Sequence, residues 1–242
     1  MPMYPRLNIG AGARAIRELG QINADLYPGR NIDAVFDASK AHWPFDDNSI
    51  DAIAVNHVLE HLPDPFIFFK EAYRVLAADG TGVVMIRIPH GSSNDALGDL
   101  THLRQFLPAS FACFQPGYGE SVFNLQYDNA APFGVMSVYE RINPKLRWLV
   151  KPVIRRWGLP AIEFLWGGYV ELFIKMRALK SAEDVTRWRI RMPGNMVPVA
   201  PCIHEHEYHG VELEDGVVPR LLFFGESAQV VQRISDQERG LA

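Results

Sequence analysis

Three features near the N-terminus could bind a cofactor that contains a nucleoside. A glycine turn, Gly10-Ala11-Gly12, follows the short apolar run 6–9. Glycine lets the backbone approach a ligand where a side chain would block it. Asp25 and Asp37 each stand at the end of a later apolar run. The Asp25 carboxylate can accept hydrogen bonds from both hydroxyls of a ribose, and the Asp37 carboxylate can accept one from an adenine amino group.

The glycine turn alone leaves the cofactor open. With Ala15 in third place it satisfies the G-x-G-x-x-A pattern of dinucleotide-binding folds, and it equally suits a plain turn between a strand and a helix. The NAD fingerprint needs an acidic residue roughly 20 residues beyond the glycines. Asp25 comes sooner than that, so the spacing disfavours NAD.

Histidines follow the later apolar runs and could act as general bases, because imidazole titrates near neutral pH. His57 and His90 come just after two runs that we expect to be neighbouring strands, so both could face one cleft. His102 follows in the string Asp-Leu-Thr-His. We predict His57, His90 and His102 as candidate catalytic residues. His61, by contrast, is expected to cap or pack within its own turn.

A group of possible zinc ligands lies near the C-terminus. Cys202, His204, His206 and His209 are residue types that bind zinc. Their spacing matches no structural zinc pattern, and glutamates are interleaved, as in a solvated polar segment. We therefore expect surface histidines here, and the sequence predicts no metal site.

Short strands and helices must position these residues. The apolar runs are continuous, as is typical of parallel strands buried on both faces. Alternation with helices predicts a doubly wound parallel sheet whose ligand lies beyond the carboxyl ends of its strands. The expected strands cover residues 6–9, 21–26, 33–37, 51–58, 82–88 and 169–176. Helices are expected over 13–19, over 63–78 with Asp64 as N-cap, and over 108–114, with a polar loop at 94–102.

One later segment is basic and amphipathic. Residues 141–157 carry six basic residues and no acid, with apolar residues between them. Such a segment can lie on an anionic membrane surface, or it can form a lid over an active site. Residues 181–242 contain scattered strand-like runs, such as 217–224, without a pattern that fixes a fold.

Composition bounds the protein class. Hydrophobic residues make up 48% and charged residues 21%, as in soluble globular proteins. The net charge of −4 does not indicate a nucleic acid partner. Only two cysteines occur, Cys113 and Cys202, and the N-terminus has no apolar stretch like a signal peptide. We expect a cytoplasmic protein; its oligomeric state is left open.

Several segments together resemble the class I S-adenosylmethionine-dependent methyltransferases. Two are the most specific: Trp43–Asp51 contains the string Pro-Phe-x-Asp-x-Ser-Ile-Asp, and Asn56–Leu62 contains Leu-Glu-His. The resemblance covers about residues 6–115 and weakens after residue 90. The other matching segments are Leu7–Gly12, Ile22–Leu26 and Asp33–Asp37.

The resemblance implies a fold and a cofactor. The fold is α/β, with a Rossmann-like, doubly wound, mostly parallel seven-stranded sheet of order 3-2-1-4-5-7-6, an antiparallel seventh strand and extra C-terminal elements. The cofactor is S-adenosylmethionine, with S-adenosylhomocysteine as product. Asn8 departs from the family, which usually has an acidic residue there. The implied cofactor-binding residues are Asn8, Gly10, Ala11, Gly12, Asp25, Leu26, Asp37, Ala38, Asn56 and His57.

The resemblance also suggests an acceptor. The segment from Ile88 to Phe111 is similar to a subset with a Pro-His…Asp-Pro-Thr-His pattern, associated with glycan and cell-surface biosynthesis, although Leu100 replaces the second proline. We predict methyl transfer to oxygen of a small-molecule or glycan-type acceptor. The alternatives are an NAD-dependent oxidoreductase and a non-catalytic cofactor-binding protein. The expected methyltransferase domain spans 1–180, with a cofactor core at 6–115 and an acceptor and lid region at 99–180. An extension of unknown role spans 181–242.

Overall fold

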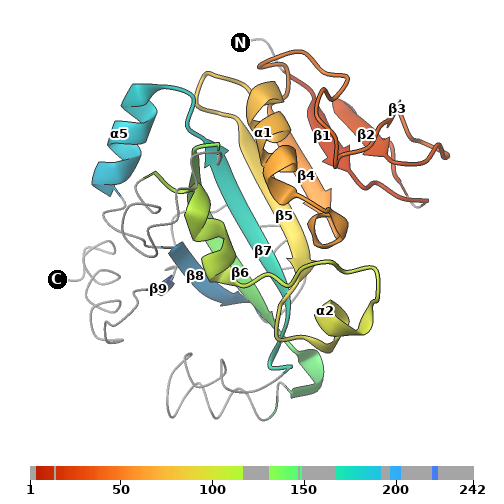
Figure 1. Ribbon diagram of the computed structural model, residues 1–242, viewed down its shortest axis with the longest axis vertical. Coiled ribbons are helices and arrows are strands. Elements are labelled where there is room, and N and C mark those ends of the chain that lie inside the picture. The colour runs from red at the N-terminus through yellow and green to blue at the C-terminus, as the bar shows by residue number, and fades with distance from the viewer. Residues whose placement is uncertain are drawn as a thin grey trace.

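One nine-stranded sheet organises the protein (Figure 1). The computed structural model describes residues 4–116 except residue 14, 131–146, 148, 167–191, 197–202 and 220–222. The strands are β1 (Arg6–Ile9), β2 (Gln21–Asp25), β3 (Ala34–Val35), β4 (Ala52–Asn56), β5 (Val83–Pro89), β6 (Phe133–Ile142), β7 (Tyr169–Ala178), β8 (Val197–Cys202) and β9 (Arg220–Leu222). The α-helices are α1 (Pro65–Val75), α2 (Asn94–Gly98) and α5 (Ala182–Arg191), and the 3-10 helices are η1 (Leu59–His61), η2 (Pro108–Phe114) and η3 (Pro144–Leu146).

The strand order confirms the predicted topology. The sheet runs β3-β2-β1-β4-β5-β7-β6-β8-β9. Strands β1 to β5 pair in parallel, and β7 is antiparallel to both β5 and β6. Beyond the seven expected strands, β8 pairs in parallel with β6, and β9 pairs antiparallel with β8. The C-terminal segment therefore extends the same sheet.

The connection after β1 differs from expectation. The predicted helix over 13–19 is wrong, because the described residues 15–19 are not helical. The side chains of Asn23 and Asn31 instead donate to two carbonyls of this segment, each at 2.9 Å. Side-chain amides thus replace the helical hydrogen bonds.

The two faces of the sheet are not buried equally. In β5, Val84, Ile86 and Ile88 are fully buried, whereas the alternate residues Met85 and Arg87 are half-buried. The prediction that such strands are buried on both faces is therefore wrong for β5. Strands alternate in this way when one face is packed and the other is only partly covered. The sheet thus leaves room for charged side chains on its second face.

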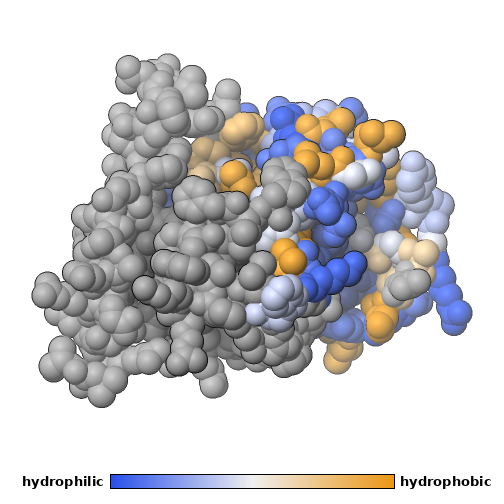
Figure 2. Space-filling view, turned by 90° about the horizontal axis from the view of Figure 1, so that it is seen from below, coloured by the Kyte–Doolittle hydropathy of each residue, from blue (hydrophilic) through white to orange (hydrophobic). Residues whose placement is uncertain are grey.

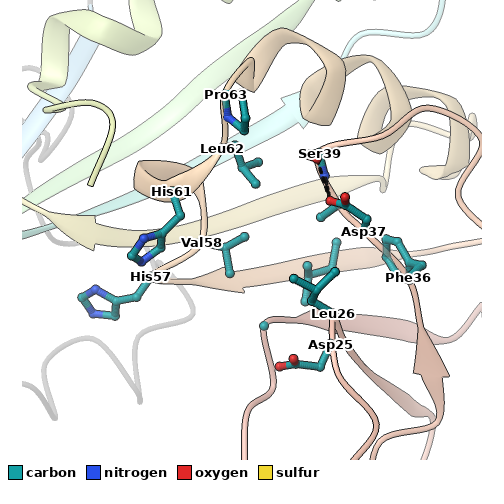
Figure 3. Close-up of a pocket in the computed structure, with 13 residues that line it drawn as sticks. Asp25, Leu26, Phe36, Asp37, Ser39, His57, Val58, His61, Leu62 and Pro63 are labelled. Carbon is teal, nitrogen blue, oxygen red and sulfur yellow. Dashed lines mark hydrogen bonds between the residues drawn. The ribbon is translucent and has the colours of Figure 1, made fainter. Parts of the chain in front are cut away.

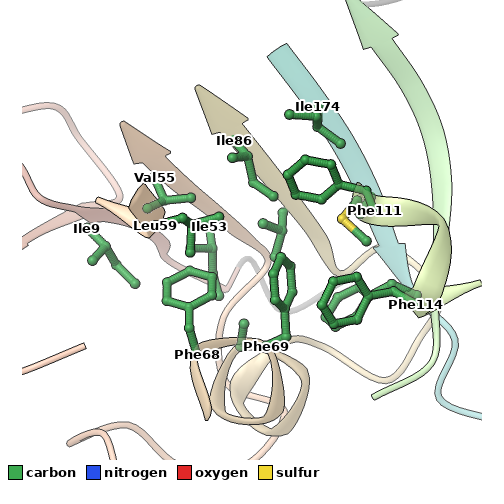
Figure 4. Packing of buried hydrophobic residues seen from close by; sticks show 14 of the residues in the cluster. Ile9, Ile53, Val55, Leu59, Phe68, Phe69, Ile86, Phe111, Phe114 and Ile174 are labelled. Atoms are coloured by element: carbon green, nitrogen blue, oxygen red, sulfur yellow. The ribbon is translucent and has the colours of Figure 1, made fainter. Parts of the chain in front are cut away.

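Aromatic residues pack the fully buried face (Figure 4). Phe68 and Phe69 of α1 point toward the sheet, and the ring centroids of Phe69 and Phe114 lie 4.1 Å apart. Phe111 comes with Phe114 from η2, so the 3-10 helix closes the core beside α1. Asp64 caps α1 as predicted, since its side chain accepts from the backbone N–H of Phe66 at 2.9 Å.

The segment Trp43–Asp51, which carries one of the two most specific sequence strings, is fastened to α1. Glu71 of α1 accepts a hydrogen bond from the backbone N–H of Trp43 at 2.9 Å. Arg74 donates to the carbonyl of Phe45 at 2.8 Å and to Asp47 at 2.7 Å. Burial acts to raise the pKa of Glu71, but hydrogen bonds from Arg74 and from the backbone outweigh it and lower that pKa. The string is thus explained in part by packing, since it anchors the chain before β4.

Other helices and strands begin or end a few residues away from the predicted positions. Helix α1 ends at Val75 rather than near 78, because Leu76 pairs with Ile50 as an isolated bridge. The predicted loop at 94–102 contains the short helix α2, which is capped by Ser93. The late strand is confirmed as β7 and extends to Ala178.

Two predictions concern segments that are only partly described. Of the basic segment 141–157, the structure describes only residues 141–146 and 148, so a lid or membrane role stays a prediction. The histidines at 204, 206 and 209 lie outside the described residues. Among the described helices, none combines the length and the apolar character that a bilayer crossing requires.

Candidate active site

A cavity of about 480 Å³ lies at the carboxyl ends of the parallel strands (Figure 3). This is the edge at which open α/β sheets bind ligands. Figure 2, turned to view the molecule from below, shows hydrophobic and hydrophilic residues interspersed over the described part of that face. The cavity is lined by Ile9, Gly10, Asp25, Leu26, Phe36, Asp37, Ala38, Ser39, His57, Val58, His61, Leu62 and Pro63.

Both the backbone conformation and a neighbouring side chain restrict position 10 to glycine. Its φ is +73°, which side chains rarely adopt. A Cβ added here would lie 2.3 Å from Cγ2 of Val58, which also lines the cavity. The turn therefore requires glycine to keep its close approach to Val58, whether or not a ligand is bound.

Asp25 is oriented by backbone groups at both carboxylate oxygens. Its Oδ2 accepts from the N–H of Gly12 at 2.8 Å, and its Oδ1 accepts from the N–H of Tyr27 at 3.1 Å. Each carboxylate oxygen accepts more than one hydrogen bond. The half-buried Asp25 can therefore still bind hydroxyl groups in the cavity.

Asp37 faces the cavity from the loop after β3. Its Oδ1 accepts from both the N–H and the hydroxyl of Ser39, at 2.9 and 2.6 Å. The hydroxyl contact is the main cause of a lowered pKa at Asp37, so this carboxyl is ionised at neutral pH. Leu26 and Phe36 line the cavity beside it and supply apolar surface on which a flat ring can pack.

His57 is held between two carboxylates. Its Nε2 lies 3.1 Å from Oε1 of Glu171, and its Nδ1 lies 3.2 Å from Oε1 of Glu60. The hydrogen bond with Glu171, followed by that with Glu60, raises the pKa of His57 to about 9. The backbone at His57 has a positive φ of 51°, which directs its side chain to this position after β4. His57 is thus an imidazolium at neutral pH, and it donates hydrogen bonds rather than accepting a proton.

Glu171 pairs with charged residues from β5, from β6 and from the turn after β4. Arg87 of β5 donates to it at 2.9 and 3.1 Å, and Arg141 of β6 donates to its Oε2. Burial acts to raise the pKa of Glu171, but the hydrogen bonds from His57, Arg87 and Arg141 together lower it to about 2. We call His57, Glu60, Arg87, Arg141 and Glu171 the Glu171 cluster. It borders the cavity through His57.

The other two predicted bases do not line the cavity. His90 is buried, with Nδ1 2.7 Å from Oγ of Ser92 and Nε2 3.4 Å from Oε1 of Glu140. His102 packs its ring edge-on against His61, with ring centroids 4.8 Å apart. His102 is therefore one residue removed from the cavity, whereas His90 lies within its own polar environment.

The cavity gathers some of the predicted residues and leaves out others. Asn8 lies within the sheet, where its side-chain amide donates to Asn23 at 3.0 Å. Asn56 is exposed at the end of β4. The predicted residues that line the cavity are Gly10, Asp25, Leu26, Asp37, Ala38 and His57; those that do not are Asn8, Ala11, Gly12, Asn56, His90 and His102.

The sequence analysis did not predict the Glu171 cluster apart from His57. Glu171 stands inside an otherwise apolar run, and a lone charge in a buried strand is a usable signal of a buried partner. Arg87 gives the same signal in β5. Their pairing became visible only through the register of β5 and β7, which places Arg87 opposite Phe173 and Pro89 opposite Glu171.

Comparisons with known proteins found one family match and several similar solved structures. Residues 18–84 match a family model described as a methyltransferase domain. No curated protein sequence matches the chain significantly. Among solved structures, the chain is similar to the YcgJ protein of Bacillus subtilis, at 16% identity over 74% of this chain and 93% of that one, with a TM-score of 0.45.

Two further solved structures are similar to the chain. An S-adenosylmethionine-dependent methyltransferase of Archaeoglobus fulgidus shares 18% identity over 72% of this chain and 86% of that one, with a TM-score of 0.48. A second, from Mesorhizobium loti, shares 14% identity over 72% and 90%, with a TM-score of 0.44. The family match covers residues 18–84, and the sheet has the strand order expected of the class I S-adenosylmethionine-dependent methyltransferase fold.

Proposed function

We propose that the protein is an S-adenosylmethionine-dependent methyltransferase that acts on a hydroxyl oxygen of a small-molecule or glycan-type acceptor. The observation that carries the proposal is the cavity itself, which adjoins two carboxylates on one side and the Glu171 cluster on the other. A site with ionic and hydrogen-bonding groups beside a cofactor pocket suits a polar acceptor better than an apolar one.

In this proposal the cofactor lies along the cavity. Asp25 accepts from the ribose hydroxyls, Asp37 from the adenine amino group, and Leu26 and Ala38 pack on the adenine ring. The methionine part passes Gly10 and ends near His57. Ala11, Gly12 and Asn56 are the remaining residues predicted to contact the cofactor, and each is close in the chain to a residue that lines the cavity. This direction places the reactive sulfonium toward the Glu171 cluster.

The acceptor then lies over the carboxyl ends of β4 and β5 and the amino end of the antiparallel strand β7. Methyl transfer is an in-line displacement at a sulfonium carbon, so positioning supplies much of the acceleration. Arg87 and Arg141 can orient a polar acceptor, and the His57 imidazolium can donate a hydrogen bond to it. A hydroxyl acceptor must also lose a proton. His90 and His102 remain candidates for that step, since the pKa of about 9 at His57 keeps it protonated at neutral pH.

The test uses radiolabelled S-adenosylmethionine with a panel of glycans and small alcohols. We expect the label to appear on a hydroxyl oxygen of an acceptor. Analogues in which that hydroxyl is blocked or missing should take up no label. Calorimetry with S-adenosylhomocysteine and with NAD distinguishes a methyltransferase from an NAD-dependent oxidoreductase, because a methyltransferase should bind only S-adenosylhomocysteine. Cofactor binding without transfer to any hydroxyl, amine or thiol acceptor would favour a non-catalytic protein. Label on nitrogen or sulfur would refute the oxygen assignment alone.

A further inference from the structure

Two histidine-containing motifs, far apart in the sequence, meet beside the cavity. One is Leu59-Glu60-His61, which forms η1, and the other is the string 99–102. The backbone N–H of Leu103 donates to the carbonyl of Glu60 at 2.8 Å and ties the two motifs together. Glu60, His61 and His102 each offer a ligand atom, and these atoms lie within 4.8 Å of one another. Nitrogen and carboxylate donors are the set that zinc prefers.

Hydrogen bonds hold His61 in the orientation of a metal ligand. Its Nδ1 lies 3.2 Å from the carbonyl oxygen of Thr101 and 3.1 Å from the hydroxyl of the same residue. That hydroxyl donates to Asp99 at 2.7 Å, so Nδ1 of His61 must be the donor to Thr101. The hydrogen therefore sits on Nδ1, and Nε2 keeps its lone pair. Ligating histidines characteristically donate their second nitrogen to a carbonyl in this way.

His102 is arranged in the same manner. Its Nδ1 lies 3.2 Å from the carbonyl oxygen of Ala96, so Nδ1 carries the hydrogen. Its Nε2 lies 3.8 Å from Oδ2 of Asp99, which pairs with the ring when it is protonated and adds negative charge beside Nε2 when it is neutral. His102 thus presents an available nitrogen on the side where His61 packs against it.

Glu60 supplies an unsatisfied oxygen. The residue is 1% exposed, and among the described residues its Oε2 has no hydrogen-bond partner. Its Oε1 is 3.2 Å from Nδ1 of His57, which fixes the carboxylate from the side of the Glu171 cluster. A buried carboxylate oxygen without a partner is costly, and binding a cation removes that cost.

We propose that Glu60, His61 and His102 bind a divalent transition-metal ion of the zinc type. Two imidazole nitrogens and one carboxylate occupy three positions of a tetrahedron and leave the fourth open. Ligand atoms of such a site lie about 3.4 Å apart, so binding draws the three side chains together. Because His61 also lines the cavity, the open position lies beside the proposed acceptor region. This inference revises the expectation, drawn from the sequence alone, that no metal site is present.

Metal binding can be measured without cofactor or acceptor, so its outcome is separable from that of the proposed function. The full chain, stripped with chelator, is titrated with Zn²⁺ by calorimetry and with Co²⁺ by visible absorption. We expect one tight equivalent and the intense visible bands of four-coordinate cobalt. His61→Ala and His102→Ala should each weaken Zn²⁺ affinity at least tenfold. Glu60→Gln, which keeps the shape of the side chain, should do the same.

Two control variants test whether histidines outside the proposed site bind the metal. His42→Asn changes an exposed histidine at a positive φ that asparagine tolerates, and it should leave the affinity unchanged. A triple alanine variant at 204, 206 and 209 should also retain the site. Circular dichroism verifies that every variant folds. Absence of a tight equivalent in the wild type, or equal affinity in the His61→Ala/His102→Ala double variant, would overturn the proposal, as would loss of binding in the triple variant alone.

Discussion

The two sides of the cavity are built in different ways. On the side where we propose that the nucleoside binds, called the nucleoside side below, Asp25 and Asp37 lie twelve positions apart in the chain, at or just after the end of a short strand. On the other side, the Glu171 cluster joins residues up to 114 positions apart, since His57 contacts Glu171 across β4, β5 and β7. The first side depends on local turns. The second depends on the pairing of β4, β5, β7 and β6 within the sheet. Mutations in the cluster should therefore lower the stability of the whole fold.

This contrast predicts that the largest loss of stability comes from the cluster. Glu171→Ala removes the acceptor that His57, Arg87 and Arg141 share and leaves their positive charges close together with one carboxylate fewer. Breaking a buried ionic network in this way costs about 3 to 5 kcal/mol in the free energy of unfolding. Urea denaturation measures it. A loss below about 1 kcal/mol, typical of a surface ion pair, would mean that the cluster is not structural.

The glycine turn should give the next largest effect. Gly10→Ala combines the cost of a positive φ with a clash against Val58, for a total of about 2 to 4 kcal/mol. Gly20→Ala is the matched control, because Gly20 has the same φ of +73° and no atom within 4 Å of an added Cβ. It should cost only about 1 to 2 kcal/mol.

A double variant identifies the source of that difference. Val58→Ala removes the clashing methyl groups, so Gly10→Ala made in that background should cost no more than Gly20→Ala. If Gly10→Ala and Gly20→Ala are equally destabilising in the wild-type background, close approach to Val58 does not constrain the turn.

On the nucleoside side, binding should suffer more than stability. Asp25→Ala should weaken S-adenosylhomocysteine affinity by about ten- to a hundredfold, as expected for loss of hydrogen bonds to a charged group. Calorimetry gives the affinity. Asp46→Ala, at an exposed aspartate outside the cavity lining, is the matched control and should bind normally. Unchanged affinity in Asp25→Ala would refute the ribose assignment.

The same contrast explains what the sequence could and could not predict. The order of seven strands, the Asp64 cap and the cavity positions of Asp25 and Asp37 all follow from local runs, turns and a family resemblance. The missing helix after β1 could not be predicted from periodicity, because side-chain amides from β2 and the following loop replace its hydrogen bonds.

Long-range pairing accounts for the remaining differences. His90 and His57 do follow neighbouring strands, yet only His57 lines the cavity. His90 ends the run that becomes β5, and its ring lies 5.2 Å from that of Tyr169 and near Glu140 of β6. Glu140 lies in β6, for which the sequence analysis predicted no range. Position at a strand end therefore located the edge of the sheet but not the direction of each side chain.

A smaller effect, that of pH, tests the cluster without disrupting its shape. Glu171→Gln keeps the size of the side chain and should cost about 1 to 2 kcal/mol at pH 7, since neutral hydrogen bonds replace charged ones. The folded protein holds the pKa of Glu171 at about 2, below its ordinary value of 4.5. A lowered folded pKa gives stability that is fully present above pH 4.5 and is lost as the pH falls toward 2.

The two proteins should therefore converge in stability in acid. Urea denaturation at steps from pH 7 to pH 2.5 should show the widest gap near pH 5, below the ordinary pKa of 6.5 of His57 and above that of Glu171, and a gap that shrinks below pH 4.5. Comparing two chains that differ only at Glu171 cancels the titration of every other carboxylate. A gap that persists unchanged to pH 2.5 would mean that the carboxylate charge is not what binds β5, β6 and β7 together at this edge of the sheet. The stabilisation would then come from packing around the side chain, and the two sides of the cavity would differ in span along the chain but not in the physical interaction that holds them.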